Sequence, residues 1–61
     1  MYNAMLFNAA VSYIGSAAPR NKDADFQRNQ CLDIACELLV YPSQYEEARR
    51  VLYYAADMAF G

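Results

Sequence analysis

The chain of 61 residues has no histidine and no tryptophan, and no charged side chain occurs before Arg20. Without histidine there is no imidazole to act as a general base or to bind a metal. The sequence also has no glycine-rich phosphate loop, no nucleophile-elbow motif and no C-x-x-C pair. We therefore expect a protein that is not an enzyme and that needs no metal and no cofactor.

Positive charge is also scarce, because five Lys and Arg face seven Asp and Glu, for a net charge of −2. A protein that binds nucleic acid normally carries a basic excess on one face. A polybasic segment for an anionic membrane is missing as well. The composition therefore predicts neither binding to a nucleic-acid backbone nor binding to a membrane.

The uncharged first 19 residues have three interpretations. A transmembrane helix needs about 20 mainly apolar residues, but Asn3, Asn8, Ser12 and Ser16 interrupt this stretch. A signal peptide would begin with a basic region, which is lacking here. We interpret the stretch as an amphipathic helix that is buried on one side, and we expect a cytoplasmic protein.

The two cysteines, Cys31 and Cys36, are predicted to lie on one helix. At a rise of about 1.5 Å per residue their Cα atoms would be roughly 8 Å apart, which is too far for a disulfide bond. We expect free thiols that act as small hydrophobic residues in a reducing compartment. The alternative is a bridge between two chains.

Apolar residues recur with helical spacing along the whole chain, so the predicted fold class is all-α: a small three-helix bundle in one domain, residues 1–61. The helices are predicted at about residues 3–18, 24–40 and 44–60. Short connections make successive helices antiparallel neighbours, which gives an up-down-up arrangement. Alternatively, the last two helices form a hairpin, and the first is completed by packing in an oligomer.

The last helix has the strongest signals. Ser43 and Glu46 form a capping box directly after Pro42, and Glu46 is spaced to pair with Arg50 four residues later. Its predicted core stripe consists of Ala48, Val51, Leu52, Ala55 and Ala59.

The first two helices are predicted by the same periodicity. Asn3 and Asp23 are the expected N-caps, and Arg20 and Lys22 should complement the dipole at the end of the first helix. In the second helix the acidic ridge Asp25, Asn29, Asp33 and Glu37 is interpreted as a solvated face. The first core stripe is Leu6, Ala10, Tyr13, Ile14 and Ala17, with Phe7 on its flank. The second is Ala24, Cys31, Ala35, Leu38 and Leu39, with Leu32 and Ile34 at its edges.

Hydrophobic residues make up 57% of the chain, which is more than three short helices can bury. The surplus predicts an exposed apolar surface and a homo-oligomer, most simply a dimer. On the outer face of the last helix, Arg and Tyr, which are enriched in binding hot spots, lie one turn apart. The small uncharged face of the first helix is a second contact candidate, or a lightly decorated solvent face. The candidate site residues are Arg49, Arg50, Tyr53, Tyr54, Phe60, Asn8 and Ser12.

Two functions fit these features. The first is a non-catalytic helical protein-interaction module, an adaptor or inhibitor that acts through this aromatic and arginine surface. The alternative is a homo-oligomer that binds or sequesters a small anionic or aromatic ligand, such as a nucleotide, between subunits. The small size and the lack of catalytic residues would suit an accessory protein of a phage or mobile element.

Overall fold

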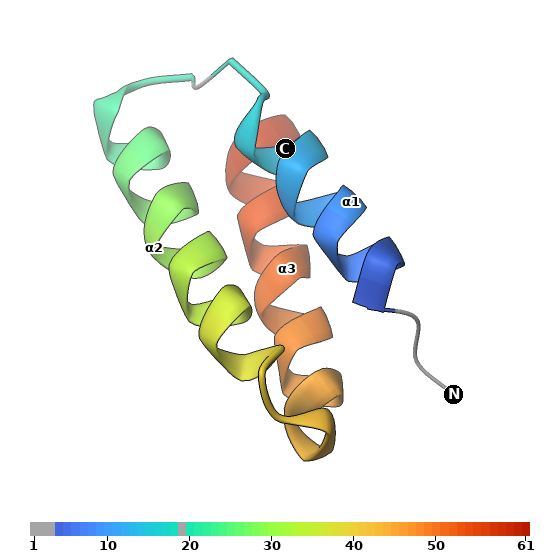
Figure 1. Cartoon of the computed structure of the whole chain (residues 1–61). Coiled ribbons are helices and arrows are strands. Elements are labelled where there is room, and N and C mark those ends of the chain that lie inside the picture. The colour runs from blue at the N-terminus through green and yellow to red at the C-terminus, as the bar shows by residue number, and fades with distance from the viewer. Residues whose placement is uncertain (1–3, 19) are drawn as a thin grey trace.

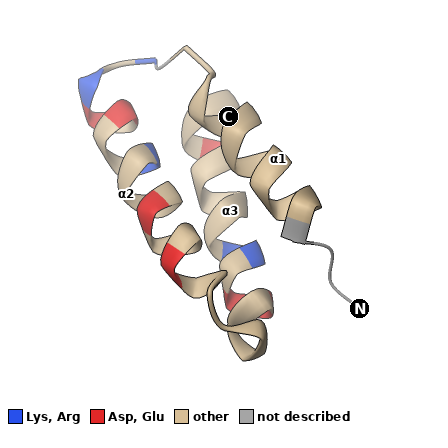
Figure 2. Ribbon diagram, in the orientation of Figure 1, with Lys and Arg blue, Asp and Glu red and all other residues tan. Residues whose placement is uncertain are grey.

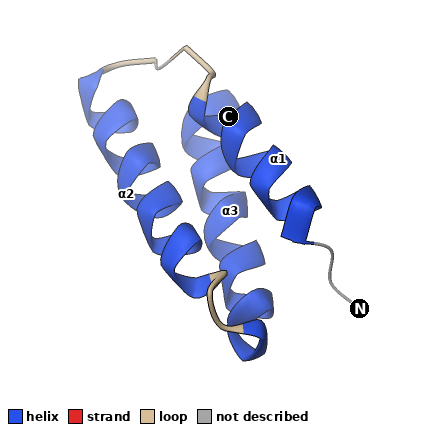
Figure 3. Cartoon of the chain, in the orientation of Figure 1, coloured by secondary structure: helices blue, strands red, loops and turns tan. Residues whose placement is uncertain are grey.

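A computed structural model describes residues 4–18 and 20–61 of the chain. These residues form three α-helices, α1 (Ala4–Gly15), α2 (Lys22–Leu38) and α3 (Tyr45–Phe60), and a short 3-10 helix, η1 (Pro42–Gln44), between the last two. No strand occurs among them (Figure 3). The predicted all-α three-helix bundle is therefore confirmed. No helix in the described part of the chain is long and apolar enough to cross a membrane.

The three helices lie side by side in an up-down-up arrangement, so that α1 and α3 run in the same direction and α2 runs against both (Figure 1). Most interhelical contacts join α2 to α3. The first helix packs on this pair within the same chain, and its contacts with α2 and α3 are sparser.

The core of the bundle is small because alanine supplies most of it. Ala35, Ala48 and Ala55 have no exposed surface, whereas no large side chain among the described residues is fully buried. The predicted stripe of α3 is confirmed. The buried apolar residues are Ile14, Ala24, Leu32, Ala35, Ala48, Leu52, Ala55 and Ala59.

The predicted inward face of α1 is confirmed for Ala10, Ile14 and Ala17, which lie in or against the core, and is wrong for its other two members. Leu6 and Tyr13 are 70% and 69% exposed. Phe7 and Val11 pack against the core instead, beside Ile14. The phenolic hydroxyl of Tyr13 stays solvated in this orientation, while the helix buries side chains that have no polar group. In α2 the same kind of correction applies to Leu32, which is a core residue and not an edge residue.

The ends of α1 and α2 also differ from the prediction. The expected cap Asn3 lies outside the described residues. The N-cap of α2 is Asn21 and not Asp23, because the Asn21 side chain accepts a hydrogen bond from the Ala24 backbone N–H at 2.8 Å. The helix therefore begins at Lys22, two residues earlier than predicted. Asp23 and Asp25 lie in its first turn, where negative charge is favourable.

The capping box predicted at Ser43 does not form. Ser43 lies inside η1, and no side chain caps either η1 or α3. An N-cap residue needs extended backbone so that its side chain can reach the free N–H groups, and the 3-10 turn removes that geometry. Main-chain carbonyls replace the cap, because Gln44 N–H donates to Tyr41 O at 2.9 Å.

Candidate interaction surface

The surface of the bundle divides by charge. The described part of α1 carries no charged residue, whereas α2, α3 and the segment before α2 carry all of the Lys, Arg, Asp and Glu in the chain (Figure 2). A partner that approaches α1 therefore meets no charged side chain on the described part of that helix.

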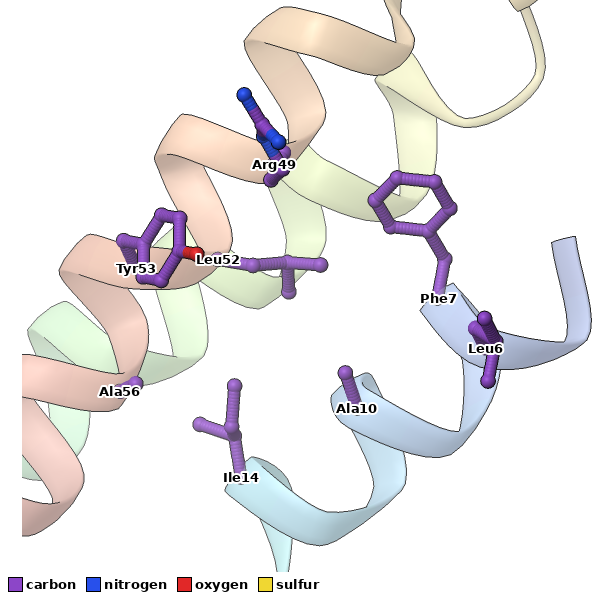
Figure 4. A pocket seen from close by; sticks show the side chains of 8 residues that line it. All are labelled: Leu6, Phe7, Ala10, Ile14, Arg49, Leu52, Tyr53 and Ala56. Atoms are coloured by element: carbon purple, nitrogen blue, oxygen red, sulfur yellow. The ribbon is translucent and has the colours of Figure 1, made fainter. Parts of the chain in front are cut away.

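A groove of about 410 Å³ lies between α1 and α3. Leu52 points toward it from α3, and Ala10 and Ile14 point into it from α1 (Figure 4). Among the described residues that line it, Arg49 is the only charged one, and Tyr53 carries the only other polar side-chain group. The full lining is Leu6, Phe7, Ala10, Ile14, Arg49, Leu52, Tyr53 and Ala56.

The groove lies between two aromatic contacts that join α1 to α3 near both ends. Phe7 meets Tyr45 near the start of each helix, with ring centroids 5.4 Å apart. Tyr13 meets Phe60 near the other end, again at 5.4 Å. Between these pairs the facing residues include alanines, Ala10 and Ala56, which are too short to fill the space.

Large apolar side chains are exposed around the groove. Leu6 and Tyr13 on α1, and Tyr53 and Phe60 on α3, are each more than half exposed. Such side chains, when they gather on one face, mark an interaction site more often than a bare solvent surface.

The predicted site residues are only partly brought together. Arg49 and Tyr53 line the groove, and Phe60 contacts Tyr13 at its end. Arg50 and Tyr54 lie outside the lining, since each follows its groove neighbour by about 100° around the helix. Asn8 and Ser12 are exposed on the side of α1 opposite the buried Ile14.

The arginines pair differently from the prediction. Arg49 contacts Glu46 at 3.3 Å, and Arg50 contacts Glu47 at 3.9 Å. Both are i,i+3 pairs on exposed side chains, so the expected pair of Glu46 with Arg50 is wrong. Surface pairs of this kind add little stability, about 0–1 kcal/mol, so Arg49 is not held firmly away from a partner.

Arg28 has a role that the sequence did not reveal. It is a buried arginine, 5% exposed, on α2. Its Nη1 donates to the backbone carbonyls of Ala17 at 2.6 Å and Ile14 at 3.4 Å, and its Nη2 donates to Asp25 Oδ1 at 2.6 Å. Arg28 thus satisfies carbonyls at the C-terminal end of α1, the function that was expected of Arg20 and Lys22.

The remaining candidates for chemistry stand apart from the groove. Both cysteines are free. Cys31 is half-buried beside the core, but Cys36 is exposed and does not act as a core residue. Of the acidic ridge, Asp33 and Glu37 are exposed as predicted, while Asp25 turns to Arg28. No group of three or more His, Cys, Asp or Glu side chains within the described residues is arranged to hold a metal ion.

The signal for Arg28 was present in its position, because it lies on the buried side of α2 between Ala24 and Leu32. The signal for the groove was weaker, since it depends on the distance between two helices. Comparisons of the chain with models of protein families, with curated proteins and with solved structures found no match.

Proposed function

We propose that this protein is a non-catalytic helical interaction module whose working surface is the apolar face shared by α1 and α3. The observation that carries the proposal is the groove between these helices, with exposed Leu6 and Tyr53 in its lining. The absence of charge from α1 and of histidine from the whole chain supports the same view. An adaptor or inhibitor in the cytoplasm would act through such a surface.

Tyr53 and Tyr54 provide a matched test of this surface. They are the same residue type, adjacent on one helix, and 69% and 66% exposed, but only Tyr53 lines the groove. A photoreactive amino acid is placed at position 53 in one protein and at position 54 in another, and both proteins are irradiated in extract of the source organism. We expect discrete protein adducts from position 53 and few from position 54.

A second substitution separates a specific surface from general stickiness. Leu6→Glu puts a charge on the opposite wall of the groove, so it should lower the adduct yield from position 53. Phe26→Glu, on exposed α2 surface away from the groove, should leave the yield unchanged. Equal adduct yields from positions 53 and 54, insensitive to Leu6→Glu, would show that the α1–α3 face is not the working surface.

The size of the groove also supports a small ligand as a second candidate function. Its volume falls in the range of roughly 300–1,000 Å³ that is typical of ligand sites. Arg49 at its edge can pair with one carboxylate, whereas the several phosphates of a nucleotide would need more cations. A thermal-shift comparison of aromatic carboxylates with the matching alcohols tests this, because a ligand that binds the folded protein raises its melting temperature. We expect the carboxylates to raise the melting temperature and the alcohols not to do so. The increase should be smaller in Arg49→Gln.

A further inference from the structure

We infer that the partner of the α1–α3 face is a second copy of this chain, related to the first by a twofold axis. The exposed side chains of this face, here called the rim residues, are Leu6, Tyr13, Tyr53 and Phe60, and those of each copy contact the groove of the other. This inference rests on the proposed function, because it names the partner of the same surface.

The first argument is electrostatic. In a twofold dimer each patch meets its own image, so a patch of one sign would face like charge. The described part of α1 is uncharged. Arg49, which lines the groove, pairs with Glu46 at 3.3 Å, and a pair that contains both signs can meet its image without net repulsion. The face is therefore suited to a copy of itself.

The second argument is shape. The same face carries both a hollow and protruding side chains. Leu6 and Tyr53 in the lining of the groove are each about 70% exposed, and Tyr13, which contacts Phe60, is 69% exposed. A groove of about 410 Å³ has room for a leucine or tyrosine side chain. Ridges and a hollow on one surface are what self-complementarity about a twofold axis requires.

The third argument is area. Aromatic side chains bury roughly 150–250 Å² each. Tyr13, Tyr53 and Phe60 are each more than half exposed, so together with Leu6 they present on the order of 500 Å². That is near the upper end of the largest patch on a monomer, about 300–600 Å². A stable interface buries roughly 800 Å² per partner, so these side chains alone would supply more than half of it.

The fourth argument is the size of the core. The chain is short, and its interior consists mainly of alanine, with no large side chain fully buried among the described residues. Small domains with so little core commonly gain stability by oligomerisation. Burial of the rim residues in a dimer would supply the missing apolar burial.

The test is the mass of the protein in solution, measured by light scattering from low micromolar to near-millimolar concentration. Three proteins are compared: the natural chain, Tyr53→Glu and Tyr54→Glu. We expect the natural chain and Tyr54→Glu to dimerise over this range. Tyr53→Glu should weaken the dimer by about thirtyfold or more, the usual effect of losing a central contact.

Circular dichroism shows whether each variant is folded. If Tyr53→Glu loses its helicity, Leu6→Glu tests the same groove from α1, with Phe26→Glu as its control on α2. A monomeric natural chain at the highest concentration would overturn the inference, and so would equal loss of dimer in Tyr53→Glu and Tyr54→Glu. The proposed function would survive a monomeric chain if position 53 still formed adducts with another protein, so the two failures are distinguishable.

Discussion

Alanine has opposite effects at two helix contacts of this bundle. In the α2–α3 pair, Ala35, Ala48 and Ala55 are fully buried, and these two helices make most of the interhelical contacts. In the α1–α3 contact, Ala10 and Ala56 line an open groove. Small side chains allow two helices to pack closely, as α2 and α3 do, but they leave a gap where the two helix backbones stay further apart, as between α1 and α3.

The difference lies in what surrounds the alanines. The aromatic pairs Phe7–Tyr45 and Tyr13–Phe60 join α1 and α3 near both ends, and the alanines between them leave the groove open. The short connection through η1 and the run of buried alanines bring α3 against α2 without such rings. One contact therefore forms a core, and the other leaves space for a partner.

The adjacent alanines of α3 test this comparison most strongly. Ala55→Leu adds a large group where no surface is exposed, so overpacking should lower the free energy of unfolding by about 3 kcal/mol. Ala56→Leu adds the same group at the groove, where it has room, and should leave stability unchanged or raise it by up to about 1 kcal/mol. Denaturant unfolding followed by circular dichroism measures both. An equal loss in the two variants would mean that the groove is not a real void.

The next test concerns how α1 is held. Arg28→Ala removes the donor to the carbonyls of Ile14 and Ala17 and should lower the free energy of unfolding by about 2 kcal/mol. Amide hydrogen exchange should show protection lost first in α1, because α2 and α3 keep their own contacts. Asp25→Asn keeps an acceptor oxygen for Arg28 and removes only the negative charge beside the buried guanidinium, so it should lower the free energy of unfolding by about 1 kcal/mol, less than Arg28→Ala. Uniform loss of protection in all three helices would show that Arg28 supports the whole core and not the α1 contact.

The contrast also explains what the sequence could predict. The buried stripe of α3 was predictable because apolar residues recur at spacings of three and four, with charged residues between them. In α1 nearly every residue is apolar or small, so the periodicity does not fix its rotation, and Tyr13 could not be told from Phe7 as a core residue. The hydrophobic pattern predicts that three helices form. The rotation of α1 about its own axis is determined only by its packing on α2 and α3.

The candidate surface was predicted in part for the same reason. Arg49 and Tyr53 were recognisable because α3 has a complete core stripe without them, and both line the groove. Their neighbours Arg50 and Tyr54 could not be separated from them, because only the position of α1 shows which side of α3 is lined. Arg28 was missed because the reason for a charged residue on an apolar stripe lies elsewhere in the chain. Its partners are the carbonyls of Ile14 and Ala17, which only the packing of α1 brings near.

The connections between helices give a smaller test. Asn21→Ala removes a side chain that caps α2 and should lower the free energy of unfolding by about 1 kcal/mol. Ser43→Ala removes no capping bond and should stay within about 0.5 kcal/mol of the natural chain. The midpoints of chemical denaturation compare them directly. A loss of 1 kcal/mol or more in Ser43→Ala would show that the capping box forms in solution after all.

The smallest expected effect lies at Gly15, the last residue of α1. No glycine among the described residues has positive φ, so the backbone there does not require glycine. A Cβ at this position would lie 3.4 Å from Leu32 Cδ1, which is ordinary van der Waals contact. Gly15→Ala should therefore raise the free energy of unfolding by about 0.5 kcal/mol, because alanine loses less backbone entropy on folding.

Ala9→Gly, on the exposed side of the same helix, is the matched control and should lower stability by up to about 1 kcal/mol. If α1 is docked as described, the two substitutions change the denaturation midpoint in opposite directions. A loss of stability in Gly15→Ala would mean that the Cβ at position 15 lies closer to Leu32 Cδ1 than 3.4 Å and clashes with it. In that case α1 would be tightly packed against α2, and its loose packing would be limited to the groove that it forms with α3.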